Sequence, residues 1–231
     1  MDLLVTAGNT QAPIDRVRCI TNIFSGRTGA ALAAEALRRG HRVALLTSHP
    51  REHDAPGVEV VPYRTFDDLR RLMQERFARP LDAAILAAAV SDYLPAGTYA
   101  PSSPFDGAFP PGTAFRDAGA GKIKSDEPEL WLRLVRAPKL VDLVRTDWAF
   151  RGILVKFKLE VGLPDDALLE VAERSRRHSG ADLMVANTLE GAASFAFIGP
   201  LGGVYERVYR GKLAERLIEA IEEKRACPTS S

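Results

Sequence analysis

Short apolar runs, each ended by turn residues, alternate with helical patterns along the chain, and this alternation most constrains the fold. The apolar runs are residues 3–5, 42–46, 58–61, 83–90, 153–157 and 183–185. Such runs are typical of strands buried on both faces, as in a parallel sheet. Apolar stripes at helical spacing occur between and after them, in residues 30–37, 66–77, 140–144, 168–172 and 212–224. Alternating strands and helices form βαβ units with right-handed crossovers. The sequence therefore predicts an α/β fold with a doubly wound, mostly parallel three-layer sheet.

Two segments depart from this alternation. Residues 194–198 and 204–209 flank a Gly/Pro-rich turn, which predicts a terminal β-hairpin at one end of the sheet. Residues 94–121 contain five Pro and five Gly and show almost no periodicity. A long loop of this kind within a compact domain usually covers a site or is disordered. We expect a mobile flap over a site, because the segment leaves a strand end and leads to Lys122.

Length and composition predict one soluble domain. The 231 residues are 46% hydrophobic and 26% charged, as in ordinary globular proteins. We expect a single Rossmann-like domain over residues 1–225 and a disordered tail at 226–231. The net charge of +1 argues against a dedicated nucleic-acid partner. No apolar stretch approaches a membrane span of about 20 residues, and no basic segment precedes an apolar run at the N-terminus, so we expect a cytoplasmic protein without a membrane partner.

Cysteine and histidine spacing indicates no metal or redox centre. Cys19 and Cys227 lack such spacing, which favours chance thiols in a reducing compartment. The four histidines fall in turns or on polar faces without ligand spacing, so we predict surface positions and no zinc site.

Three loops at predicted strand ends are candidates for chemistry, because ligands of open α/β sheets bind beyond the carboxyl ends of the strands. The first candidate is Gly8 together with the helix start at residues 25–29, where a Ser25 cap and free N–H groups favour an anion. A capped helix start without function explains this pattern equally well. The second is residues 87–93, where alanines leave room for a flat ring and Asp92 accepts from a base amine. By spacing alone, Asp92 is better explained as an N-cap aspartate or a solvated turn.

The third loop follows Phe157, which is predicted to end its strand and to pack on a base. Lys156 and Lys158 lie unusually near this buried strand, although alternation alone would make them a solvent-facing pair. A dinucleotide site is the rival interpretation of these three loops. It is disfavoured because no G-x-G-x-x-G follows the first strand and no acidic residue follows the second.

Taken together, the motifs resemble one family. The stretch "VTAGNTQAPIDRVRCITNIFSGRTGAALAAEALRRGH" resembles the opening of phosphopantothenoylcysteine synthetases, the phosphopantothenate–cysteine ligases of coenzyme A biosynthesis. The blocks "AAAVSDY", "GKIKS", "LRLVRAPKLVDLV", "GILVKFKLE" and "ADLMVANTLEGAASFAFI" follow in the family's order. The resemblance covers nearly the whole chain.

The resemblance implies a ligase that activates the carboxylate of 4′-phosphopantothenate with a nucleoside triphosphate, CTP or ATP. Cysteine then attacks the acyl-nucleotide. It also implies Mg²⁺ as cofactor, with ligands that stay unassigned, and a homodimer with the flap near its interface. Two alternatives remain open: a nucleotide-binding oxidoreductase on the same fold, and a non-catalytic family member.

Residue by residue, the resemblance implies the following roles. Asn22 contacts the acyl-phosphate, and Lys122 closes over the triphosphate. The residues matched to nucleotide or substrate binding are Gly8, Ser25, Gly26, Arg27, Ala87, Ala88, Asp92, Pro138, Lys139, Leu140, Val141 and Phe157.

The chain departs from the family pattern at four places. Asn9 stands where a second glycine is usual, and Phe24 replaces a serine. The flap is longer than usual. Ser175 and Ser179 occupy positions where fused bacterial enzymes carry lysines that bind the triphosphate. These changes leave the choice of nucleotide open.

Overall fold

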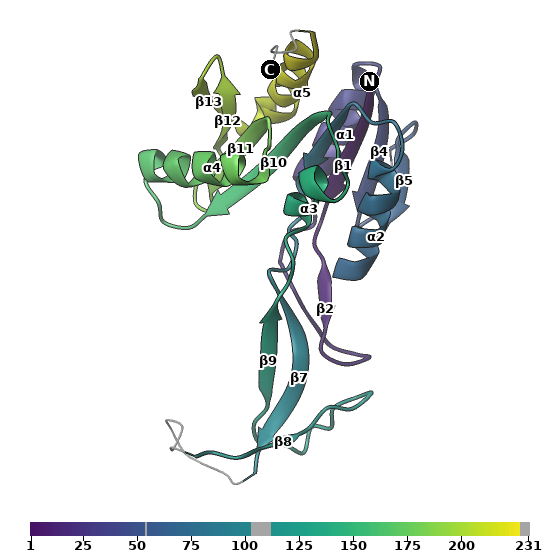
Figure 1. Ribbon diagram of the computed structural model, residues 1–231, viewed down its shortest axis with the longest axis vertical. Coiled ribbons are helices and arrows are strands. Elements are labelled where there is room, and N and C mark those ends of the chain that lie inside the picture. The colour runs from purple at the N-terminus through teal and green to yellow at the C-terminus, as the bar shows by residue number, and fades with distance from the viewer. Residues whose placement is uncertain (54, 103–111, 227–231) are drawn as a thin grey trace.

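An eight-stranded sheet forms the centre of the molecule (Figure 1). The computed structural model describes residues 1–231 except 54, 103–111 and 227–231. The sheet has the order β13-β12-β11-β10-β6-β1-β4-β5. Its strands are β1 (Asp2–Ala7), β4 (Arg42–Thr47), β5 (Glu59–Pro62), β6 (Ala83–Leu86), β10 (Ile153–Glu160), β11 (Leu183–Thr188), β12 (Phe195–Leu201) and β13 (Val204–Tyr209).

The pairing of the strands confirms the predicted topology. Every pair from β5 to β11 is parallel, whereas β11–β12 and β12–β13 are antiparallel. The hairpin of β12 and β13 therefore closes one end of the sheet, as its turn residues predict. The run at 83–90 ends as a strand at Leu86, earlier than expected, because β10 last pairs with it there. Beyond that point the segment still bonds to the residues that follow β1: Ala89 N donates to Gly8 O at 2.8 Å.

Helices cover both faces of the sheet because side chains of successive strand residues alternate between faces. One face, with Leu3 and Val5 of β1, packs against α1 and α5. On the other face, Leu4 packs against α2 and α3, and Met184 of β11 packs against α4. The helices are α1 (Arg27–Arg38), α2 (Phe66–Phe77), α3 (Leu140–Thr146), α4 (Asp165–Ser179) and α5 (Leu213–Ala226), with a short 3-10 turn η1 (Arg210–Lys212) before α5.

The chain end differs slightly from expectation. Helix α5 continues to Ala226, so the first residue of the predicted tail is helical. Residues 227–231 lie outside the described part of the chain.

A separate antiparallel arm projects from the sheet (Figure 1). It contains β7 (Tyr93–Pro101), β8 (Phe115–Asp117) and β9 (Trp131–Arg136). The expectation of a flap without regular structure at 94–121 is therefore wrong for the parts that form β7 and β8, while residues 103–111 lie outside the described chain. Because β7 contains prolines, its sequence does not resemble that of a strand. The ladder with β9 tolerates them through an irregularity between Pro95 and Gly97.

A second short hairpin, β2 (Gln11–Pro13) with β3 (Cys19–Thr21), leaves the main sheet between β1 and α1. Its tip contacts the arm: Arg16 N donates to Gly121 O at 3.0 Å.

Glu173 on α4 joins that helix to the terminal hairpin. Its carboxylate accepts hydrogen bonds from Arg176 and Arg177, at 2.8 and 2.7 Å, and from the hydroxyl of Tyr205 at 2.8 Å. The Arg176 guanidinium, more than the other two donors, holds the pKa of Glu173 well below its ordinary value of 4.5, against an opposing effect of burial. A carboxyl with a lowered folded pKa stabilises the fold above its unfolded pKa, and this stabilisation is lost as pH falls.

We therefore expect Glu173→Gln to lower the free energy of unfolding at pH 7 by about 1 kcal/mol, since the carboxylate is partly screened by solvent. Urea unfolding at several pH values measures this, and the deficit should shrink as pH falls below the ordinary pKa of 4.5. Glu170→Gln is the control, because Glu170 is an exposed carboxylate on the same helix. A deficit that does not change with pH would contradict the assignment.

Candidate functional site

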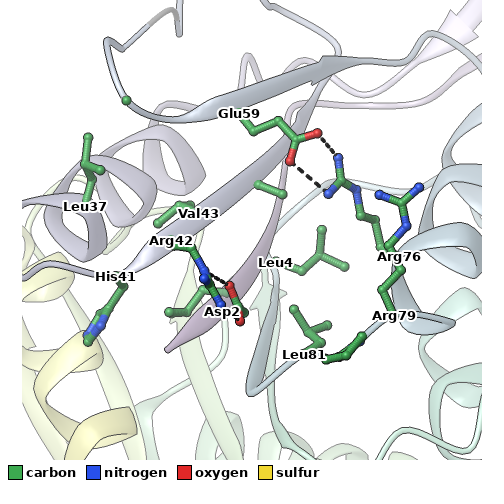
Figure 2. A pocket seen from close by; sticks show the side chains of 14 residues that line it. Asp2, Leu4, Leu37, His41, Arg42, Val43, Glu59, Arg76, Arg79 and Leu81 are labelled. Atoms are coloured by element: carbon green, nitrogen blue, oxygen red, sulfur yellow. Dashed lines mark hydrogen bonds and ion pairs between the residues drawn. The ribbon is translucent and has the colours of Figure 1, made fainter.

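A hollow at the amino ends of the sheet's strands is lined by ion pairs between the chain's own side chains. A cavity of about 390 Å³ lies beside the starts of β1, β4 and β5 (Figure 2). Within it Arg42 bonds to Asp2 at 2.5 Å, and Arg76 bonds to Glu59 at 2.9 Å. These charges satisfy one another. Ligands of open α/β sheets bind beyond the opposite, carboxyl ends of the strands, and the candidate site lies there, at what is called below the carboxyl edge.

Three glycines meet where β1 ends and α1 begins. Gly8 has φ 87° and Gly26 has φ 92°, in the left-handed region that favours glycine. A Cβ on Gly26 would lie 2.2 Å from Gly8 N, and a Cβ on Gly29 would lie 2.6 Å from the Cβ of Ala7. The chain thus leaves the sheet at Gly8, forms the β2–β3 hairpin, and returns against its own starting point at Gly26.

These glycines provide backbone features that a dinucleotide fingerprint collects within one short motif. Those features are a tight turn, a close backbone approach and close packing of helix on strand. Here Gly8, Gly26 and Gly29 divide them, with the hairpin inserted between the first two. Glycines that are far apart in the sequence thus lie close together in the fold. The segment "SGRTG" was the only signal of this.

Positive charge gathers at the start of α1. Gly26 is the N-cap and no side chain caps the helix, so the expected Ser25 cap is wrong. Arg210 of η1, which sequence reasoning missed, donates to Thr28 Oγ1 in the first helical turn. Burial lowers the pKa of Arg210, and the nearby charge of Arg27 lowers it further. Uncapped N–H groups beside two guanidinium groups suit an anion such as phosphate.

Asn22 lies beside this helix start and bridges two strand ends. Its Nδ2 donates to Ala89 O at 3.0 Å, and its carbonyl accepts from Asn9 Nδ2 at 2.5 Å. Ala89 N in turn bonds to Gly8 O. The structure thus brings Asn22, Gly8 and the loop after β6 into one hydrogen-bonded cluster at the carboxyl edge.

The residues predicted to recognise the base lie in the loop that follows β6, at the same carboxyl edge. Ala87 and Ala88 are half-buried, and Ala88 N is held by Thr6 Oγ1 at 3.2 Å. Asp92 is exposed, and its carbonyl accepts from Ala137 N at 2.9 Å, which ties this loop to the start of α3.

The four residues at the start of α3 that the resemblance matches to nucleotide binding differ in their exposure to solvent. Pro138 and Lys139 are exposed, and Val141 is half-buried. Leu140 is 4% exposed and belongs to the hydrophobic core. The side chain of Leu140 therefore packs the sheet.

Strand β10 also differs from expectation. Phe157 does not end the strand, because β10 continues to Glu160 in pairing with β11. Phe157 lies just past Lys156, the last residue paired with β6, and is half-buried against the core. Lys156 is not on a solvent face: its Nζ donates to Ser175 O at 3.1 Å and to Ser179 Oγ at 3.3 Å. Burial lowers the pKa of Lys156.

Lys122 is not brought to this edge. It is exposed on the arm, and the next residue is held by the β2–β3 hairpin: Ile123 N donates to Asp15 Oδ2 at 3.1 Å, and Arg18 donates to Ile123 O at 2.6 Å. A shallow cavity lined by residues 122–126 lies on the arm. The arm stands away from the sheet (Figure 1), without closing over the carboxyl edge.

The described residues contain no group of three or more His, Cys, Asp or Glu side chains placed to hold a metal ion. None of their helices has both the length and the apolar character needed to cross a membrane.

Comparisons with known proteins agree with the sequence resemblance. Residues 1–101 match the family described as DNA/pantothenate metabolism flavoprotein C-terminal domain. The chain is 32% identical over 226 residues to the coenzyme A biosynthesis bifunctional protein CoaBC of Thermococcus kodakarensis, covering 96% of this chain and 51% of that protein. It spans about half the length of the curated relatives it matches.

Solved structures share the fold. The DNA/pantothenate metabolism flavoprotein from Streptococcus pneumoniae is 28% identical with a TM-score of 0.79, over 96% of this chain and 99% of that one. A Cab2 mutant in complex with phosphopantothenate-cysteine is 19% identical with a TM-score of 0.71, over 97% of this chain and 86% of that one. The second likeness concerns the fold alone. The α/β fold predicted from the sequence is confirmed.

Proposed function

We propose that this chain is a phosphopantothenoylcysteine synthetase, because residues 1–101 match the family described as DNA/pantothenate metabolism flavoprotein C-terminal domain. It would join 4′-phosphopantothenate to cysteine in coenzyme A biosynthesis, as a nucleotide-dependent ligase. One observation carries the proposal: Asn22, the glycines at the start of α1 and the loop after β6 meet at one edge of the sheet. Sequence identity to CoaBC along nearly the whole chain supports it.

The proposed reaction has two steps. The carboxylate oxygen of 4′-phosphopantothenate attacks the α-phosphorus of the nucleotide, and pyrophosphate leaves. The amine of cysteine then attacks the acyl carbon, loses a proton, and displaces the nucleoside monophosphate. No enzyme nucleophile is needed, so the protein acts by positioning and by stabilising charge.

The residues at the carboxyl edge would divide this work. The uncapped N–H groups of α1, with Arg27 and Arg210, bind the phosphates. Asn22 directs its side-chain amide to the acyl-phosphate, giving up its bond to Ala89 O. The edge that includes Asp92 and the loop after β6 receives the base, which is cytosine or adenine.

Magnesium would reach this site with the nucleotide. It would be held mainly by phosphate oxygens, as Mg²⁺ often is. When bound, the ion neutralises charge on the triphosphate.

A homodimer is part of the proposal. Large apolar side chains are exposed on the arm and the β2–β3 segment: Val17, Ile20, Ile23, Phe24, Tyr93, Phe115, Leu134 and Val135. Exposed apolar surface of this kind marks interaction sites. In a dimer, the arm of one chain would carry Lys122 to the site of the other, which accounts for its position away from the edge.

We expect Val135→Asp on β9 to yield monomers, because a carboxylate buried in an apolar interface is unfavourable. Light scattering after size exclusion should give about 25.2 kDa for the variant and twice that for the parent chain. Val204→Asp is the matched control, since Val204 is exposed on the terminal hairpin, away from the arm. A parent chain at the monomer mass would contradict the dimer.

The direct test of the proposed reaction is pyrophosphate release in the presence of 4′-phosphopantothenate, cysteine, Mg²⁺ and either CTP or ATP. Release that requires 4′-phosphopantothenate supports the ligase and identifies the nucleotide. Tight nucleotide binding without release would indicate a non-catalytic member. Binding of a nicotinamide or flavin cofactor in place of the triphosphate would favour the oxidoreductase alternative.

A further inference from the structure

Asn9 is buried beneath Asn22 at the end of β1. It stands where the family resemblance leads one to expect glycine, and it is 7% exposed. Its Nδ2 donates to Asn22 O at 2.5 Å, while its backbone N donates to Ser48 Oγ at 2.9 Å. The side chain therefore spans the gap between the end of β4 and the segment that carries Asn22.

The hydrogen bonds around Ser48 fix the orientation of this carboxamide. Ser48 Oγ lies 3.2 Å from Asn9 Oδ1 and 2.9 Å from His49 Nδ1. A serine hydroxyl donates one hydrogen bond and accepts two. It accepts from Asn9 N, and toward Oδ1 it is the donor, because an amide oxygen can only accept. Tyr63 beside it donates to Ala7 O at 2.7 Å.

Both polar atoms of the Asn9 side chain therefore have a partner, and the amide cannot flip without breaking these bonds. The Nδ2 group is therefore aimed at the Asn22 carbonyl by Ser48 and His49 on the neighbouring strand end. This anchor holds the backbone of Asn22. It is independent of the bond from the Asn22 side chain to Ala89 O.

This independence matters for the reaction proposed above, on which the inference rests. To reach the acyl-phosphate, the Asn22 side chain must exchange Ala89 O for the ligand. If that bond were the main contact holding the segment around Asn22, the segment would become more mobile when Asn22 binds the ligand. We propose that Asn9 is a positioning residue: held by Ser48 and His49, its carboxamide fixes the Asn22 backbone while the Asn22 side chain binds substrate.

Asn9→Asp tests the proposal with the smallest change in shape. The carboxylate still accepts from Ser48, but it cannot donate to Asn22 O and repels it. We expect kcat to fall about tenfold, since small misplacements near reacting groups cost that much or more. The KM for the nucleotide should change less than twofold, because the helix start is untouched. Asn9→Gly should lower kcat to a similar extent.

A double-variant cycle separates positioning from general damage. In an Asn22→Ala background, Asn9→Asp should lower kcat no further, because its effect passes through Asn22. Gln11→Glu is the control: it makes the same amide-to-acid change two residues along, where Gln11 accepts from Arg64 at 2.6 Å, and it should keep parent kcat. An additive loss in the double variant would overturn the proposal.

Hydrogen–deuterium exchange provides a readout that does not need ligase activity. In Asn9→Asp, amides of residues 19–26 should exchange faster than in the parent chain, and Gln11→Glu should leave them unchanged. Unchanged exchange in Asn9→Asp would overturn the positioning role even if the ligase is active. Absence of pyrophosphate release by the parent chain would instead refute the proposed function.

Discussion

Replacing Asn22 with alanine is expected to lower product formation at least about 100-fold while leaving nucleotide binding intact. Removing one donor aimed at developing charge typically costs 100- to 1,000-fold in kcat, on the order of 3–4 kcal/mol. The nucleotide should still bind, because the uncapped start of α1 and the glycines beside it are unchanged. Titration calorimetry with the nucleotide and an assay of pyrophosphate release measure the two effects separately.

Cys19→Ala is the control for this variant. Cys19 is an exposed, free thiol on the same hairpin, so its loss should leave both measurements at parent values. Thermal unfolding checks that Asn22→Ala is folded, since it also loses the bond to Ala89 O. Turnover at the parent rate in the folded variant would refute the role of Asn22.

The second large effect is expected for Gly26→Ala. The residue has φ 92°, and a Cβ there would lie 2.2 Å from Gly8 N, a backbone atom that cannot move aside alone. We expect a loss of about 2–4 kcal/mol in the free energy of unfolding. Nucleotide affinity should also fall at least about tenfold, because relieving the clash separates the ends of β1 and α1.

Gly40→Ala isolates the two contributions. Gly40 has a similar φ of 84°, but a Cβ there would meet nothing within 4 Å. Its substitution should cost only the left-handed conformation, about 1–2 kcal/mol, with no change in nucleotide affinity. Urea unfolding and calorimetry of both variants give the comparison. Equal losses at the two positions would show that the approach of Gly26 to Gly8 has no role.

The centre of the main sheet was predictable because strands such as β1 and β11 are buried on both faces and appear in the sequence as continuous apolar runs. The arm was not predictable by the same rule. Its strand β9 is exposed over most of its length and β7 contains prolines, so neither shows the apolar run or alternation that marks a buried strand. The prediction that this segment covers a site rested on its length, its Pro and Gly content and its position between a strand end and Lys122.

The candidate site was predictable only where its residues lie close together in the sequence. Asn22 and the start of α1 are neighbours, and the family motif includes both. Arg210 reaches Thr28 from 182 positions away, and no local pattern marks such a residue. Strand alternation indicates on which face of the sheet Lys156 lies, but not whether a helix covers that face. Helix α4 covers it, and Lys156 bonds to Ser175 of that helix.

The close approach of Gly26 to Gly8 leaves the length of the segment between them free to vary. Lengthening a closed loop is inexpensive, at about 0.6 kcal/mol for each doubling of its length. A long segment can therefore lie between two contacting glycines while the contact itself is retained. In this chain that segment carries Asn22, the residue proposed to meet the acid. Under the proposed function, the nucleotide and the acid would therefore meet where the end of β1 touches the start of α1.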